Sequence, residues 1–180
     1  MQSKLAPKGI LIERLVELKK IRNAYGGLRA KKTKRLVETA KETNSPGFEL
    51  LKSLELRLQT IVFRTGYCKS IRAARQLVSH GHVRINGDRV VQPSYRVKEG
   101  QFITIDPHIG LCRLPANPAF DPEISKFKKP EECDVYISPP YLLVHPKYPV
   151  ATLLREPSPA EIKVISNLLQ VKPYRICNIF

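Results

Sequence analysis

The chain has 180 residues, 42% of them hydrophobic, which suits one domain or two small domains with a buried core. Its 31 Lys and Arg outnumber 16 Asp and Glu, and the formal net charge of +15 indicates a polyanionic partner. No apolar run approaches the roughly 20 residues of a membrane-spanning helix, so the sequence lacks the signature of a membrane-spanning protein. No cysteine pair has zinc-ligand spacing, so it also lacks the signature of a zinc-binding protein.

Charge and proline divide the chain near residue 105. The first 105 residues hold 22 Lys and Arg against 8 Asp and Glu, a net +14, whereas the remaining residues hold 9 against 8. Proline occurs 3 times in the first part and 12 times in the second. We therefore expect a cationic folded region, opened by a basic arm over Met1–Gly9, and then a nearly neutral, proline-rich segment. The cysteines are interpreted as reduced structural thiols: Cys68, Cys112, Cys133 and Cys177.

Three helices are predicted in the first 64 residues. Apolar residues at helical spacing indicate a helix that ends at Gly26-Gly27 and a second helix over 28–43. Ser45 as N-cap and Pro46 as first helical residue begin a third helix, which we expect to run to about Arg64.

Basic residues project from these helices. The second helix carries a run of five, and such a run usually forms a solvated face; because few acids balance it here, RNA contact is the favoured interpretation. Arg57 and Arg64, seven residues apart, are expected along one seam of the third helix. The alternative for each arginine is pairing with Glu55 or with a helix end.

A short helix is predicted between Ser70, a good N-cap, and Gly81, a good left-handed stop. At about 100° per residue, one side of this helix is apolar and the opposite side is polar. The apolar side holds Ile71, Ala74, Leu77 and Val78, and the polar side holds Arg72, Arg75 and Ser79.

A β-hairpin signal follows this helix. Asn86-Gly87 supplies the two positive-φ positions of a type I′ turn. A two-residue turn places Arg84 directly opposite Arg89, an arrangement of like charges that is destabilising unless an anion lies between them. The helix and the hairpin together therefore predict a phosphate-binding surface. His80 and His82 are interpreted as surface histidines near phosphate rather than as metal ligands.

Strands and one further helix are expected after the hairpin. Gln101–Ile105 should close a small sheet, and 135–137 and 142–145 resemble short strands. Ser158 and Glu161 have capping-box spacing and open an amphipathic helix with Ile162, Ile165, Leu168 and Leu169 on one side.

Four runs of the central segment closely resemble the RNA-binding domain named after ribosomal small-subunit protein S-four. They are 57–64, 70–80, 83–87 and 93–100. Upstream, Leu18–Gly26 and the Asn-Ser-Pro-Gly turn at 44–47 look like the helical domain of that ribosomal protein, so the likeness runs from about Ile10 to Ile105.

The resemblance implies an α+β fold with an N-terminal helical domain over 1–53 and an S-four-type RNA-binding domain of two helices on a short antiparallel sheet over 54–105. Composition and the capping box add a proline-rich C-terminal extension over 106–180 that ends in a helix without counterpart in the relatives. In such relatives the region after 105 returns to extend the sheet. The family's members bind small-subunit ribosomal RNA at a multi-helix junction in the 5′ region, nucleate assembly and lie near the messenger RNA entry path.

We expect the same role here, with ribosomal RNA and neighbouring ribosomal proteins as partners and without cofactor, metal, membrane or catalysis. The capped helix is expected to dock on a neighbouring ribosomal protein or, alternatively, to fold back on the chain's own sheet. The divergent ends of the chain favour a mitochondrial ribosome, with a plastid or the bacterial cytoplasm as alternatives.

The residues expected to contact RNA are the polar and basic ones of the matched segments. They are Arg57, Arg64, Lys69, Ser70, Arg72, Arg75, Gln76, Ser79, His80, His82, Arg84, Asn86, Arg89, Ser94, Tyr95, Arg96 and Lys98, with Lys19, Lys20, Arg22, Tyr25, Arg29, Lys31, Lys32, Lys34 and Arg35 upstream.

Two other functions share the domain. A pseudouridine synthase or similar RNA-modifying enzyme would need a separate catalytic domain, for which only the proline-rich segment is left. A free-standing factor that binds stalled ribosomal RNA would consist of little more than the domain itself, and the upstream helices argue against it.

Overall fold

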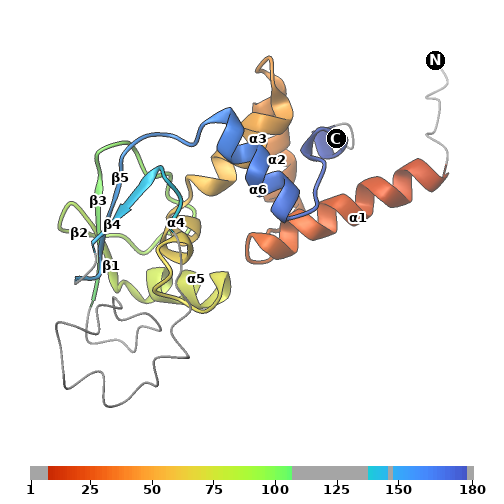
Figure 1. Cartoon of the computed structure of the whole chain (residues 1–180). Coiled ribbons are helices and arrows are strands. Elements are labelled where there is room, and N and C mark those ends of the chain that lie inside the picture. Colours follow the sequence, from red (N-terminus) through yellow and green to blue (C-terminus); the bar gives the residue numbers. More distant parts are fainter. Residues whose placement is uncertain (1–7, 107–137, 146–147, 178–180) are drawn as a thin grey trace, which may run out of the picture. The chain divides into compact units, whose positions relative to one another are not determined.

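A computed structural model describes residues 8–106, 138–145 and 148–177 of the chain (Figure 1). The fold is α+β, as predicted. Two compact units form: a helical unit of Met1–Glu55 with Pro157–Phe180, and a sheet unit of Leu56–Glu156. The described residues of the segment 106–180, predicted as one extension, are therefore divided between the two units. Residues 1–7 of the arm predicted over Met1–Gly9, the predicted strand at 135–137, Cys112 and Cys133 lie outside the described residues, whereas residues 8 and 9 belong to the first helix and not to an arm.

The helical unit contains α1 (Lys8–Ala24), α2 (Ala30–Lys41), α3 (Pro46–Glu55), α6 (Pro159–Leu168) and α7 (Pro173–Cys177). The predicted stop after α1 is confirmed, because Gly26 and Gly27 have φ values of 78° and 75° that favour glycine. The predicted start of α3 at Pro46 is confirmed as well.

The core of the helical unit is built from aliphatic residues of α1, α2, α3 and α7. Ile21, Val37, Leu50 and Ile176 are fully buried. Inside the same core, the hydroxyl of Tyr25 donates a hydrogen bond to the carboxylate of Glu55 over 2.6 Å. This bond satisfies two polar groups that would otherwise destabilise an apolar interior.

The C-terminal helices complete this unit by packing on its N-terminal helices (Figure 1). The predicted capping box of α6 is present, with the Ser158 amide donating to the Glu161 carboxylate over 2.7 Å. The backbone N–H of Lys172 donates to Glu17 over 3.0 Å, and Arg175 pairs with Glu13 over 2.8 Å.

The alternative that α6 folds back on the sheet is wrong, since Ile162 of α6 is 3% exposed within the helical unit, and docking of α6 on a neighbouring protein stays a prediction. The side of α6 that was predicted to be apolar is only partly covered, because Leu168 remains 77% exposed.

The sheet unit packs α4 (Leu58–Arg64) and α5 (Ile71–His80) on a five-stranded sheet. The strands are β1 (Val83–Ile85), β2 (Asp88–Arg89), β3 (Phe102–Ile105), β4 (Leu142–Val144) and β5 (Val150–Leu153). Their order is β2-β1-β3-β5-β4, with every pair antiparallel. The region after residue 105 therefore extends the sheet, as the resemblance implied.

The core of the sheet unit joins the two helices to one face of the sheet. Val62 of α4, Val78 of α5, Ile103 of β3 and Leu153 of β5 are each fully buried. The hydroxyl of Tyr67, between α4 and α5, donates to the carbonyls of His145 and Tyr148 at 3.2 and 3.0 Å. This contact ties the residue after β4 and a residue shortly before β5 to the helices.

The prediction of one helix from Pro46 to Arg64 is wrong, because the chain breaks between α3 and α4. Arg57 is extended, with φ −73° and ψ 138°, and its backbone pairs with Arg96. The N–H of Val97 donates to the carbonyl of Leu56 over 3.0 Å. These residues thus form sheet-like pairs with a segment that lies far along the sequence, which helical periodicity cannot reveal.

Two negative findings concern the described residues. None of their helices is long and apolar enough to cross a membrane. The thiols of Cys68 and Cys177 are buried and unbridged, and burial raises the pKa of Cys177 from its ordinary value.

Candidate nucleic-acid interface

The α5 helix presents a cationic face on a well-anchored backbone. The side chain of Ser70 accepts from the Ala73 N–H over 3.2 Å, and Gly81 ends the helix with φ 79°, so both predicted caps are confirmed. Ala74 and Val78 are buried against the core. The exposed residues of α5 are Arg72, Arg75, Gln76, Ser79 and His80. These side chains therefore project into solvent from a helix whose position is fixed by its buried face.

The predicted hairpin is also present beside α5. Asn86 and Gly87 have φ values of 52° and 96°, and Arg84 lies directly opposite Arg89 in the register of β1 and β2. Asn86 has a structural role too, since its side-chain oxygen accepts from the Phe102 N–H over 2.9 Å.

Arg89 is directed toward the C-terminal end of α5. Its guanidinium donates to the carbonyl of His80 over 2.8 Å and lies over Gly81, where a Cβ atom would collide with it. The partial negative charge of a helix C-terminus favours a cation at this place. This contact separates the Arg89 guanidinium from the simple cross-strand pair expected with Arg84, and an anion between the two arginines stays a prediction.

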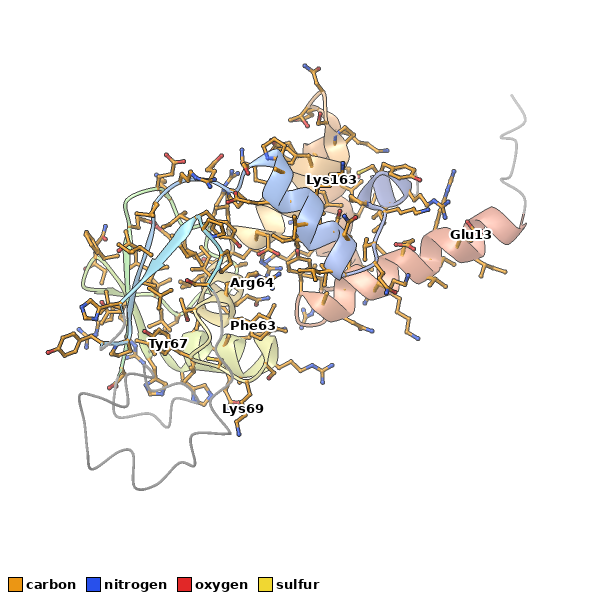
Figure 2. The ribbon with its side chains drawn as sticks, in the orientation of Figure 1. Glu13, Phe63, Arg64, Tyr67, Lys69 and Lys163 are labelled. Atoms are coloured by element: carbon orange, nitrogen blue, oxygen red, sulfur yellow. The ribbon has the colours of Figure 1, made fainter. Side chains whose placement is uncertain are left out.

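The remaining predicted residues of the sheet unit lie outside α5 and the β1–β2 pair. Lys69 is exposed, and Arg64 lies over the ring of Phe63 at 5.8 Å; both are visible in Figure 2. Other predicted residues have intramolecular ionic partners: His82 approaches Asp106 at 3.9 Å, and Arg96 pairs with Glu156 at 3.2 Å. The hydroxyl of Tyr95 accepts from the Gln101 side chain, and that of Ser94 accepts from the Gln92 side chain. The Lys98 N–H donates to the Gln101 side chain.

Arg57 does not lie on the surface, contrary to our expectation of an exposed seam. It is 7% exposed at the N-cap of α4. Burial, and after it the positive charge of Arg75, lowers the pKa of Arg57 from its ordinary value. Its Nε and Nη1 atoms, and the hydroxyl of Thr60, are buried without a hydrogen-bond partner among the described residues. Thr60 was missed by the sequence analysis, because nothing in the helical pattern distinguishes it from an interior threonine.

The basic residues of the helical unit are largely exposed. Lys19, Arg29, Lys31, Lys32 and Arg35 lie in solvent, as do Lys20 and Lys34, which pair with Glu17 and Glu38. Arg22 is half-buried and donates to the Leu28 carbonyl over 2.6 Å. Tyr25 is wrongly predicted as an RNA contact, because it is 1% exposed and bonded to Glu55 in the core.

The surface of the described residues carries cations and hydrogen-bond donors. Within the described ranges, no group of three or more His, Cys, Asp and Glu side chains could hold a metal ion. What the arrangement can do is bind anionic oxygen atoms with exposed guanidinium and ammonium groups.

Comparison with known proteins gives a consistent result. The S4 domain pattern matches residues 56–103. Small ribosomal subunit protein uS4 of Persephonella marina is 47% identical over 93 residues, 51% of this chain and 45% of that protein. The protein of the same name from Aquifex aeolicus is 46% identical over 93 residues, covering 51% and 44%. Small ribosomal subunit protein uS4c of Guillardia theta is 47% identical over 96 residues, covering 53% and 48%.

The chain spans about half the length of these relatives. They come from bacteria and from Guillardia theta, so they give no support to the expected mitochondrial location.

Proposed function

We propose that this chain, which matches the S4 domain over residues 56–103 and is similar over about half its length to uS4 proteins of the small ribosomal subunit, is a structural, ribosomal RNA-binding component of a small subunit. The observation that carries the proposal is the exposed cationic face of α5, which lies within the matched domain and is fixed by caps at both ends. Because the cations of this face have fixed positions, they can bind several RNA phosphates in one defined arrangement.

The mode of recognition follows from the chemistry of the surface. A-form RNA hides its base edges in a deep, narrow groove, so a rigid protein recognises junction shape and phosphates. The chain has no Trp and only 7% aromatic residues, which disfavours base stacking as the main contribution. The proposed target is a multi-helix junction in the 5′ region of small-subunit RNA. Cations that neutralise its converging phosphates would nucleate assembly there, with messenger RNA passing nearby.

The proposed RNA contacts are the predicted residues of both units that are exposed. Tyr25 is left out because it is buried, and Arg89 also donates a hydrogen bond to the end of α5. Neighbouring ribosomal proteins are the proposed further partners. For the compartment, bacterial and plastid-type ribosomes are favoured by the relatives over the mitochondrial ribosome.

The test measures binding of the purified chain to small-subunit RNA over a range of salt concentrations. Each phosphate contact should contribute about 0.7–0.9 to the log–log slope, so a surface of several cations predicts a steep dependence. The chain should also remain with small subunits during sedimentation at high salt. A shallow salt slope together with loss from the subunits would refute the proposal, and conversion of uridines by the chain would favour the enzymatic alternative.

A further inference from the structure

Arg57 is a buried cation for which the described residues provide no counter-charge. Two of its three guanidinium nitrogens, Nε and Nη1, have no hydrogen-bond partner there. Its charged neighbour is Arg75, which repels it; an acidic side chain close by would raise its pKa, and none of the described residues does so. Burying an ionised group without a partner is strongly unfavourable, so natural proteins pair such groups with anions.

The backbone holds Arg57 in this place. Its own main chain pairs with Arg96, and the next two N–H groups donate to the carbonyls of Tyr95 and Pro93 at 2.8 and 3.2 Å. The flanking Leu56 and Leu58 are completely buried. These contacts fix the main chain of Arg57, so its side chain starts from a defined place between buried neighbours.

A second unused donor lies one turn further along α4. The hydroxyl of Thr60 is buried without a partner, and the residue is 1% exposed. Arg57 is the N-cap and Thr60 is the third helical residue, positions whose side chains lie on the same side of a helix start. Arg75, by contrast, is exposed on α5 and can be reached from solvent.

We propose that Arg57, Thr60 and Arg75 form a recess for one phosphodiester group of the bound RNA. This inference rests on the proposed function, and it places one of the RNA contacts at a buried residue. Arg75 meets the phosphate from the exposed side, and the unpaired N–H groups of Arg57 donate to its oxygens from behind after a small rotation of the guanidinium. Arginine suits this role because its planar fork binds phosphate oxygens in pairs.

The recess links RNA binding to the stability of the sheet unit. A ligand that binds only the folded state stabilises it by mass action, and here it also neutralises a buried charge. The free protein therefore contains an uncompensated cation, and an anion in the recess should make it measurably more resistant to unfolding.

The experiment compares thermal unfolding of the full chain in sodium phosphate and in sodium chloride at equal ionic strength. Inorganic phosphate is the probe. The variants are Arg57→Met, Arg75→Met and Thr60→Val, with Arg155→Met as the matched control, because Arg155 is an exposed arginine of the same sheet unit.

Phosphate should raise the Tm of the wild type and of the control by several degrees more than chloride does. In chloride, Arg57→Met should unfold at or above the wild-type Tm, since it removes a buried charge, and it should lose most of the phosphate shift. Arg75→Met, an exposed change, should lose the shift as well, and Thr60→Val should reduce it. Unfolding of Arg57→Met in chloride, or a full phosphate shift in both arginine variants, would overturn the proposal.

RNA binding separates this inference from the proposed function. If the wild type binds small-subunit RNA and Arg57→Met binds it roughly 10- to 100-fold more weakly, with a salt slope lower by about 0.7–0.9, both stand. Equal binding by wild type and Arg57→Met would overturn the recess and leave the proposed function intact. Failure of the wild type to bind that RNA would overturn the proposed function, while the phosphate shift alone would then identify the recess as a site for free phosphate.

Discussion

Replacing Gly81 by alanine tests how Arg89 is held against the end of α5. Gly81 has φ +79°, and a Cβ atom there would collide with the guanidinium of Arg89. Left-handed backbone costs a non-glycine residue about 1–2 kcal/mol. Displacing Arg89 also breaks its bond to the His80 carbonyl, which is worth about 0.5–1.5 kcal/mol at an exposed site. We expect Gly81→Ala to lower the free energy of unfolding by about 1.5–3.5 kcal/mol in total, measured by urea denaturation with circular dichroism.

Gly100 provides the matched control in the same unit. Its φ is +75°, and nothing lies within 4 Å of a Cβ atom built on it, so Gly100→Ala should show the backbone strain alone. The excess cost of Gly81→Ala should disappear in a protein that also carries Arg89→Ala, because no guanidinium is then displaced. If the two glycine variants cost the same, or if the excess persists without Arg89, the described contact does not stabilise the hairpin.

Three further predictions concern stability and use the same denaturation assay. Tyr25→Phe should lower the free energy of unfolding by about 1.5–3 kcal/mol, because the buried Glu55 loses a donor; an unchanged value would contradict the role of this bond. Ser158→Ala should cost about 1 kcal/mol through loss of the N-cap, and amide exchange should increase in the helical unit; faster exchange confined to the sheet unit would contradict the assignment of α6. Arg89→Gln should destabilise the free protein by about 0.5–1.5 kcal/mol while Arg84→Gln should not, and the reverse order would contradict the stabilising role of the Arg89–His80 contact.

Local sequence signals predicted most of the elements correctly. The caps of α5 at Ser70 and Gly81, the Asn86-Gly87 turn and the capping box at Ser158 all depend on contacts between residues at most four positions apart. Such contacts are encoded in the residues themselves, because a hydroxyl at an N-cap or a glycine at a left-handed position has few alternatives. The exposed face of α5 followed from the same local pattern.

The errors concern contacts between distant segments. The break between α3 and α4 depends on pairing of Arg57 with Arg96, and the burial of Tyr25 depends on Glu55. Helical periodicity predicts an exposed Arg57 only if residues 46–64 form one unbroken helix, which they do not. The same local pattern contains no information on which unit the C-terminal helices join. For the candidate site, the sequence therefore indicated the exposed cations correctly but not the buried donors behind them.

The central claim is that the exposed face of α5 binds small-subunit RNA, and a double charge reversal tests it most directly. Arg72→Glu with Arg75→Glu changes two exposed side chains and removes the repulsion between Arg75 and Arg57, so the Tm should be no lower than that of the wild type. The control, Arg155→Glu with Lys163→Glu, makes the same change in net charge at exposed residues outside the proposed contacts. In sedimentation with small subunits at high salt, the control should remain bound and the α5 variant should be lost. Retention of a folded α5 variant at the level of the control would contradict the account.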